Sequence, residues 1–183
     1  MSLNKTFAEY LQWQSKEKMN SSAQAAIADN AIDQIPKEVQ SVLCIGIGDG
    51  YEIKRLKEIG IKQVTGITLN LEAVRFHRSL VEKMDMYSMQ YPDNSFDLVF
   101  AKDVFEHAFS HWAALKEMVR VSSQYIIIIL PDPVVWSEGV YHTIVPYPSQ
   151  MTALAKKFNL KLIKQWTYQA VGHHQVYGFL FEK

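Results

Sequence analysis

The sequence predicts an α/β fold in which parallel strands are covered by helices on both faces. From residue 42 onward, short apolar segments typical of strands alternate with segments whose apolar residues recur at helical spacing. The run "YIIIIL", residues 125–130, is apolar throughout, as expected for a central strand buried on both faces. With 183 residues, 48% of them hydrophobic, the chain can bury one core. We therefore expect a single domain, with a helical N-terminal lid or cap over residues 1–35 and a core over residues 36–183.

The elements follow one another with short connections. Phe7, Tyr10, Leu11 and Trp13 recur at helical spacing, and Pro36 ends the helical N-terminal segment. Strands are then predicted over residues 42–46, 63–67, 80–84, 96–101 and 125–130, and helices over 51–59, 71–77 and around 112–119. After a proline-rich loop, 131–148, we expect a helix over 149–158. The final strands, 160–168 and 175–181, are expected to form an antiparallel hairpin at one edge of the sheet.

Charge and cysteine content limit the partners and the location. Nineteen basic and nineteen acidic side chains give a net charge of +0, so no overall field attracts nucleic acid or a membrane surface. The single cysteine, Cys44, lies in an apolar run and fits a reducing compartment. No segment approaches the ~18 apolar residues of a membrane helix, and the N-terminus does not resemble a signal peptide. We expect a cytoplasmic protein, either a monomer or a homodimer.

A glycine-rich turn, "VLCIGIGDG", follows the first predicted strand. Gly46, Gly48 and Gly50 would lie at the carboxyl end of that strand, where ligands bind in open parallel sheets. Glycine allows positive φ angles and lets the backbone approach a ligand closely. Tyr51 occupies the place of the last glycine in the dinucleotide fingerprint, which disfavours a nicotinamide-dependent oxidoreductase. A tight turn without any ligand remains an alternative at this point.

Four segments in order resemble the class I S-adenosylmethionine (SAM)-dependent methyltransferases, over about residues 40–131. They are "VLCIGIGDG", "VTGITLN" (64–70), "MDMYSMQYPDNSFDLVFAKDVFEH" (84–107) and "WAALKEMVRVSSQYIIIILP" (112–131). The resemblance implies SAM as cofactor. It also implies a doubly wound, mostly parallel, Rossmann-like sheet of seven strands in the order 3-2-1-4-5-7-6, with an antiparallel edge strand.

The resemblance also implies which residues surround the cofactor. It assigns the glycine turn to close backbone contact, Thr68 and Leu69 to the ribose and adenine, Asp85 and Met86 to the adenine edge and face, and Ala101 to the methionine end. Cys44 and Thr68 stand where the family usually has acidic residues. A hydroxyl cannot reproduce the bidentate carboxylate contact with a ribose, so we expect SAM binding weaker by ~1.5–3 kcal/mol unless Asn70 or Asp49 compensates.

Two histidines are candidates for the chemistry. His107 follows the predicted strand 96–101, and His142 lies in the loop after the "YIIIIL" strand. Either could accept a proton from a hydroxyl acceptor near neutral pH, although a helix-start residue and a surface loop residue are the alternative readings. His107 and His111 stand four residues apart, but no third metal ligand is evident, so no metal is expected.

These observations favour a SAM-dependent methyltransferase that acts on a small molecule, with oxygen slightly preferred over nitrogen as acceptor. Aromatic residues could wall the cleft, or could simply belong to the core: Tyr10, Trp13, Trp136, Tyr141 and Tyr147. The alternative function is a noncatalytic, Rossmann-like binding or regulatory protein with a weakened cofactor site.

Overall fold

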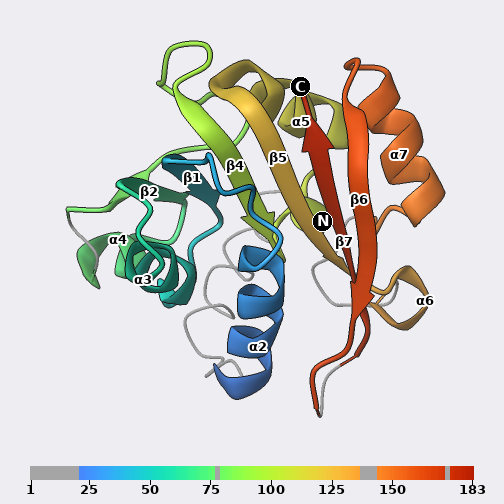
Figure 1. The fold of residues 1–183 in the computed structure, drawn as a ribbon, viewed down its shortest axis with the longest axis horizontal. Helices are drawn as coiled ribbons and strands as arrows, with labels where there is room; N and C mark the ends of the chain where they lie inside the picture. Colours follow the sequence, from blue (N-terminus) through green and yellow to red (C-terminus); the bar gives the residue numbers. More distant parts are fainter. Residues whose placement is uncertain (1–20, 77–78, 137–143, 172–173) are drawn as a thin grey trace, which may run out of the picture.

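A seven-stranded sheet forms the centre of the protein (Figure 1). The computed structural model describes residues 21–76, 79–136, 144–171 and 174–183. Its strand order is β3-β2-β1-β4-β5-β7-β6, which confirms the predicted topology. The strands are β1 (Ser41–Ile45), β2 (Gln63–Thr68), β3 (Val81–Lys83), β4 (Phe96–Lys102), β5 (Ser122–Pro131), β6 (Lys161–Tyr168) and β7 (Val176–Glu182).

Strand β7 runs in the direction opposite to the other six strands of the sheet. The pairs from β3 through β5 are parallel, whereas β7 pairs antiparallel with both β5 and β6. The arrows of β4, β5 and β6 therefore point down in Figure 1 and that of β7 points up. The predicted hairpin at one edge is confirmed, with β6 as the outer strand.

The helices lie close to their predicted positions. They are α2 (Ser21–Ile32), α3 (Tyr51–Glu58), α4 (Leu71–Phe76), α5 (His111–Val121), α6 (Pro133–Trp136) and α7 (Pro148–Lys156), with a 3-10 helix, η1 (Phe105–His107). Ser110 begins α5, since its hydroxyl accepts the N–H of Ala113. The proline-rich loop contains α6, which the sequence did not predict. There Asp132 accepts the N–H of Val134 at 2.8 Å and so satisfies a free donor of the first turn.

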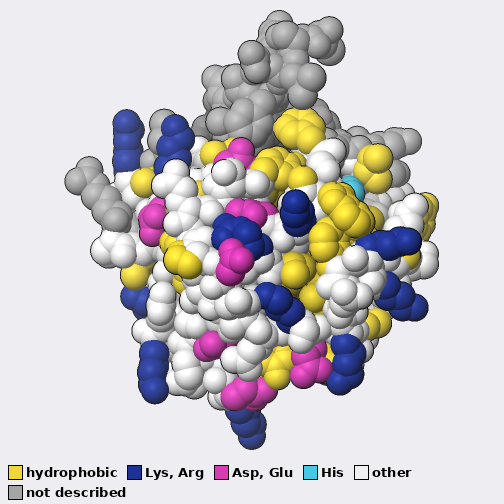
Figure 2. All heavy atoms as spheres, turned by 90° about the horizontal axis from the view of Figure 1, so that it is seen from above, with side chains coloured by type: hydrophobic (Ala, Val, Ile, Leu, Met, Phe, Trp, Pro, Cys, Tyr) yellow, Lys and Arg dark blue, Asp and Glu magenta, His cyan; other side chains and the backbone are white. Residues whose placement is uncertain are grey.

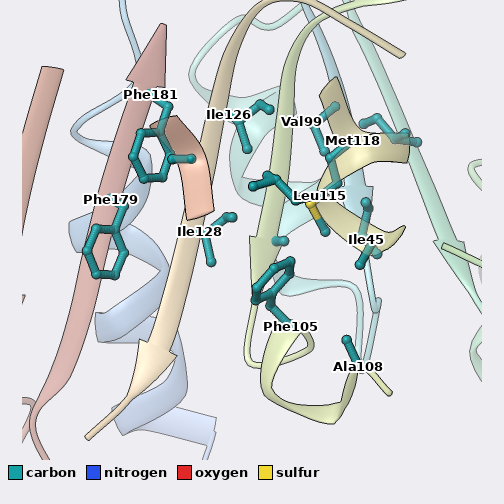
Figure 3. Packing of buried hydrophobic residues seen from close by; sticks show 14 of the residues in the cluster. Ile45, Val99, Phe105, Ala108, Leu115, Met118, Ile126, Ile128, Phe179 and Phe181 are labelled. Carbon is teal, nitrogen blue, oxygen red and sulfur yellow. The ribbon is translucent and has the colours of Figure 1, made fainter. Parts of the chain in front are cut away.

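Alternate residues of each strand enter two separate hydrophobic clusters, one on each face of the sheet. The first cluster packs α5, α7 and η1 against one face, where Leu115 and Met118 lie beside Val99 and Ile45 (Figure 3). The second packs α2 and α3 against the other face. Within β4, for example, Val99 belongs to the first cluster and Phe100 to the second. Burial on both faces explains why the central strands carry almost no polar residues.

Helix α2 is fixed to α3 and to the outer hairpin by polar contacts. Asp29 accepts hydrogen bonds from the hydroxyl of Tyr51 and from Nε of Arg55, at 2.9 and 3.0 Å. Nε1 of Trp166, in β6, donates to Oδ1 of Asn30 at 3.0 Å. A Cβ on Gly178 would lie 2.2 Å from the Trp166 ring, so the indole lies directly over the backbone of β7. These contacts join the helix that precedes β1 to the last two strands.

Charged side chains of both signs are interspersed on the surface. Figure 2 shows this from above, at the edge of the sheet where β4 and β5 begin. The mixture agrees with the net charge of +0 and shows no single-sign field on this face. Among the described residues, no helix is long and apolar enough to cross a membrane.

Candidate cofactor site

The carboxyl ends of β1, β2, β3 and β4 meet at one edge of the sheet. Gly46 follows β1, and its N–H donates to the carbonyl of Ile67 in β2 at 2.9 Å. The carbonyl of Thr68, at the end of β2, accepts the N–H of Met84 just after β3. These bonds bring the glycine turn, Thr68 and the segment before Asp85 to the same edge, as the parallel register requires.

The glycine turn folds tightly against its own chain. Gly46 and Gly50 have φ angles of +78° and +81°, where an L side chain is strained. A Cβ on Gly46 would lie 2.6 Å from Val104, and one on Gly66 would lie 2.6 Å from Ile47. Gly46 therefore makes room for Val104, and Gly66 makes room for Ile47 of the second cluster. Gly48, by contrast, is exposed, so its backbone is accessible to a ligand.

Thr68 is nearly fully buried and already accepts one hydrogen bond. Its Oγ1 accepts the N–H of Asn70 at 3.1 Å, and a hydroxyl that accepts one hydrogen bond can still donate its own hydrogen. Leu69, next to it, is half-buried. Thr68 therefore offers a single hydroxyl at the position where the family usually has a carboxylate.

Asp85 and Met86 lie in a turn after β3. Asp85 is exposed, and one of its oxygens, Oδ1, accepts the N–H of Tyr87 at 3.0 Å. Met86 is half-buried and packs against the first cluster. The hydroxyl of Tyr87 accepts the N–H of Phe109 at 2.6 Å, which ties this turn to the residues that precede α5.

Cys44 and Ala101 are buried on opposite faces of the sheet. Cys44 is 1% exposed in the second cluster, and Ala101 is fully buried in the first. Burial raises the pKa of the Cys44 thiol well above its usual value, and the nearby charge of Glu52 raises it further. The thiol is therefore an inert, neutral group beneath the turn rather than a nucleophile.

A buried ionic cluster lies at the carboxyl end of β4, and the sequence analysis missed it. Nζ of Lys102 contacts Gln24 of α2 at 2.7 Å, Asp103 at 3.0 Å and Glu52 of α3 at 3.4 Å. Its side chain is 5% exposed. Burial alone would lower the pKa of Lys102, but Asp103 and Glu52 raise it above its usual value, so the ammonium stays charged.

Asp103 and Glu106 continue this cluster into η1. Asp103 has a φ of +50°, a conformation that residues other than glycine rarely adopt outside functional or tightly determined sites. Glu106 is 2% exposed. Burial, and then the charge of Asp103, raise the pKa of Glu106 well above its usual value, which favours its neutral form.

Of the two candidate histidines, His107 and His142, only His107 lies within the described residues. His107 is half-buried at the end of η1, and its N–H donates to the carbonyl of Val104 at 3.1 Å. His111 stacks on Phe105 with ring centroids 4.9 Å apart, and burial lowers its pKa despite hydrogen bonds with the backbone of Phe105 and Ile144. His142 lies outside the described residues. No group of three or more metal-ligating side chains occurs within the described parts of the chain.

Several aromatic and apolar side chains are exposed beside η1 and at the starts of α5 and α7. They are Phe109, Trp112, Ile144 and Tyr147, each at least half exposed. We call them the apolar rim. Tyr10, Trp13, Tyr141 and the side chain of Trp136 lie outside the described residues.

The comparison with known protein families identifies the type of domain to which this edge of the sheet belongs. Residues 43–128, which include the glycine turn, η1 and Lys102 with its partners Glu52 and Asp103, match the family model of the methyltransferase domain. Residues 43–128 therefore form a methyltransferase domain, in line with the resemblance to the class I SAM-dependent methyltransferases. SAM is therefore the cofactor of this methyltransferase, and an enzyme is favoured over the noncatalytic alternative.

Solved structures agree with the methyltransferase fold. A SAM-dependent methyltransferase from Archaeoglobus fulgidus aligns with a TM-score of 0.79 at 18% identity, over 95% of this chain and 99% of its own. A putative methyltransferase from Haloferax volcanii, in complex with the activator Trm112, aligns with a TM-score of 0.79 at 15% identity, over 99% and 97%. The magnesium protoporphyrin IX methyltransferase of Synechocystis, with bound S-adenosylhomocysteine (SAH), gives 0.70 at 11% identity, over 88% and 84%.

The residues at this edge fit the cofactor. The exposed backbone at Gly48, the hydroxyl of Thr68 and the carboxylate of Asp85 supply polar groups, and Met86 supplies an apolar surface. One signal in the sequence could have revealed the ionic cluster. The strand "FDLVFAK" ends in a lysine at a position that strand alternation places on the buried face toward α2 and α3.

Proposed function

We propose that this methyltransferase transfers the methyl group of SAM to a hydroxyl of a small, largely apolar molecule. When bound, SAM supplies an electrophilic methyl group on a sulfonium. In this proposal the glycine turn, Thr68, Leu69, Asp85 and Met86 hold the cofactor. Methyl transfer of this kind depends on alignment and on exclusion of water more than on covalent catalysis.

The position of η1 carries the proposal. Val104 packs against Gly46 of the glycine turn, and His107 stands three residues later on the same short segment. We propose that the contact between Val104 and Gly46 also keeps His107 near the cofactor. We propose that its imidazole would accept the proton of the acceptor hydroxyl while the oxygen attacks the methyl carbon, whose bond to sulfur would break to release SAH.

The apolar rim supports an apolar acceptor. Phe109 and Trp112 are 62% and 51% exposed and follow His107 within five residues. Exposed aromatic side chains around an active site are typical of pockets for small apolar ligands. We propose that the rim binds the body of the acceptor while His107 faces its hydroxyl. We further propose a cytoplasmic, single-domain enzyme, monomeric or homodimeric, that binds neither nucleic acid nor membrane.

Methyl-labelled SAM and paired acceptors test the proposal. Apolar phenols and alcohols are compared with amines of matched shape, and product mass identifies the methylated atom. We expect oxygen methylation by the wild type, and a 10²–10⁴-fold lower kcat for His107→Gln with SAM affinity changed less than threefold. His111→Gln is the matched control, since His111 packs on Phe105 and should leave the shape of the pH profile unchanged.

Two outcomes would contradict the proposal. Label found only on nitrogen, or only in a macromolecular fraction of a cell extract, would exclude a small hydroxyl acceptor. A His107→Gln variant with the wild-type rate and pH profile would exclude His107 as the base.

A further inference from the structure

The buried ionic cluster at the carboxyl end of β4 carries an excess of negative charge. Lys102 contributes one ammonium, and Glu52 and Asp103 contribute one carboxylate each, at 3.4 and 3.0 Å from Nζ. One ammonium and two carboxylates leave one net negative charge. Burial keeps this excess poorly screened, because the Lys102 side chain is only 5% exposed and that of Glu52 only 14%.

The two carboxylates of the cluster lie on elements that adjoin the glycine turn. Glu52 is the second residue of α3, which begins immediately after Gly50, and its charge acts on Cys44, two residues before Gly46. Asp103 follows β4, which pairs with β1 in parallel, so that Ala101 lies opposite Ile45. Both carboxylates therefore flank the turn, one from α3 and one from β4.

The cluster is positioned from three elements at once. Gln24 of α2 accepts a hydrogen bond from Lys102 at 2.7 Å, and the two carboxylates come from α3 and from the end of β4. Asp103 adopts a φ of +50° to face Lys102. A buried cation with three fixed partners holds both carboxylates in one geometry, at a cost in backbone strain that a surface ion pair would not require.

We propose that Glu52 and Asp103, held by Lys102, determine the preference of this methyltransferase for a positively charged cofactor over its neutral product. The inference rests on SAM binding at this edge. SAM carries a sulfonium, an ammonium and a carboxylate, hence one net positive charge. SAH has lost the sulfonium charge and is neutral overall. The excess carboxylate charge favours the binding of SAM over that of SAH, and so favours the release of SAH after methyl transfer.

This arrangement accounts for the absence of an acid at Cys44. The carboxylate that β1 lacks is supplied from Glu52, whose charge reaches the buried Cys44 thiol from the first turn of α3. Because burial raises the pKa of Glu106 and so favours its neutral form, Glu106 adds little to the cluster's excess of one negative charge. Glu52 and Asp103 are specificity-determining residues in this view, and neither is required to touch the transferred methyl group.

Titration calorimetry with SAM and with SAH tests the inference on the full chain. Glu52→Gln and Asp103→Asn each remove one charge and keep the side-chain shape, and asparagine tolerates the left-handed backbone of position 103. For each variant we expect SAM affinity to fall about tenfold and SAH affinity to change less than threefold. Glu58→Gln, on the same helix but exposed in its ion pairs with Lys54 and Arg55, should leave both affinities unchanged.

The outcomes separate this inference from the assignment of the cofactor. If SAM and SAH both weaken equally in Glu52→Gln and Asp103→Asn, the carboxylates serve only the structure and the inference is overturned. Unchanged affinities in both variants overturn it as well. If the wild type binds neither SAM nor SAH, cofactor binding at this edge fails and the inference fails with it.

Discussion

Single alanine substitutions at Gly46, Gly60 and Gly66 should separate the effects of backbone strain and of steric overlap on stability. Gly60 has a φ of +94° with no atom within 4 Å of an added Cβ, so Gly60→Ala introduces strain alone. Gly66 has no positive φ, but its added Cβ would lie 2.6 Å from Ile47 and 2.9 Å from Ile53, so Gly66→Ala introduces overlap alone. Gly46→Ala combines both, with φ at +78° and Val104 at 2.6 Å.

The magnitudes follow from these geometries. The left-handed conformation costs an L-residue about 1–2 kcal/mol, and an extra methyl group in a packed core costs about 1–3 kcal/mol. All three variants gain the same small term from a less flexible unfolded chain, so this term cancels in the comparison. We expect losses of about 1–2 kcal/mol for Gly60→Ala, about 1–3 for Gly66→Ala and about 2–5 for Gly46→Ala.

Urea unfolding at 25 °C, followed by tryptophan fluorescence, measures these free energies. Val104→Ala provides a further check, because it removes Cγ1 and Cγ2, two of the three Val104 atoms that the new Cβ of Gly46→Ala would meet, and leaves only Cβ at 2.6 Å. The double variant Gly46→Ala/Val104→Ala should therefore be more stable than the sum of the two single losses. A Gly46→Ala variant no less stable than Gly60→Ala, or strict additivity in the double variant, would refute the assigned contact between Val104 and the turn.

Two further predictions concern acidic side chains. Asp85→Ala should weaken SAM binding at least severalfold in calorimetry, and unchanged affinity would mean that the adenine edge is assigned to the wrong residue. Glu106 has a folded-state pKa above its unfolded value, so the folded protein holds a proton that the unfolded chain releases. Its contribution to stability is therefore complete below the unfolded pKa of about 4.5 and is lost as pH rises through the folded pKa. Glu106→Gln lacks this titration, so the unfolding free energy of the variant should rise relative to that of the wild type between pH 5 and pH 8. A difference between the two unfolding free energies that does not change with pH would contradict burial of Glu106 in its neutral form.

Much of the fold follows from patterns that the sequence displays directly. Alternating strand and helix signals fixed the parallel part of the sheet, and the all-apolar segment of β5 is buried on both faces as expected. The strand order came from the family resemblance, since local patterns do not reveal which strands are neighbours. Helix α6 was missed because it is short and begins at Pro133, within a segment whose prolines indicate a loop.

The site was less predictable than the fold. Gln24, Glu52 and Lys102 are far apart in the chain, and no periodic pattern links them, although the structure joins them within 3.4 Å. The contact between Gly46 and Val104 is equally remote in sequence. Glycine spacing indicated a turn with positive φ, which is present, but it could not indicate whether a ligand or the chain itself fills the space beside each glycine.

The hydrogen bond between Asn30 and Trp166 has a consequence during synthesis. The two residues are separated by 136 positions. At translation rates of 5–20 residues per second, Trp166 leaves the ribosome roughly 7–27 s after Asn30. Helix α2 must therefore wait for the part of its docking surface that the last two strands supply, although its contacts with α3 can form earlier. Because β7 must also insert between β5 and β6, the sheet closes only late in translation, and pausing before residue 176 would prolong this vulnerable stage.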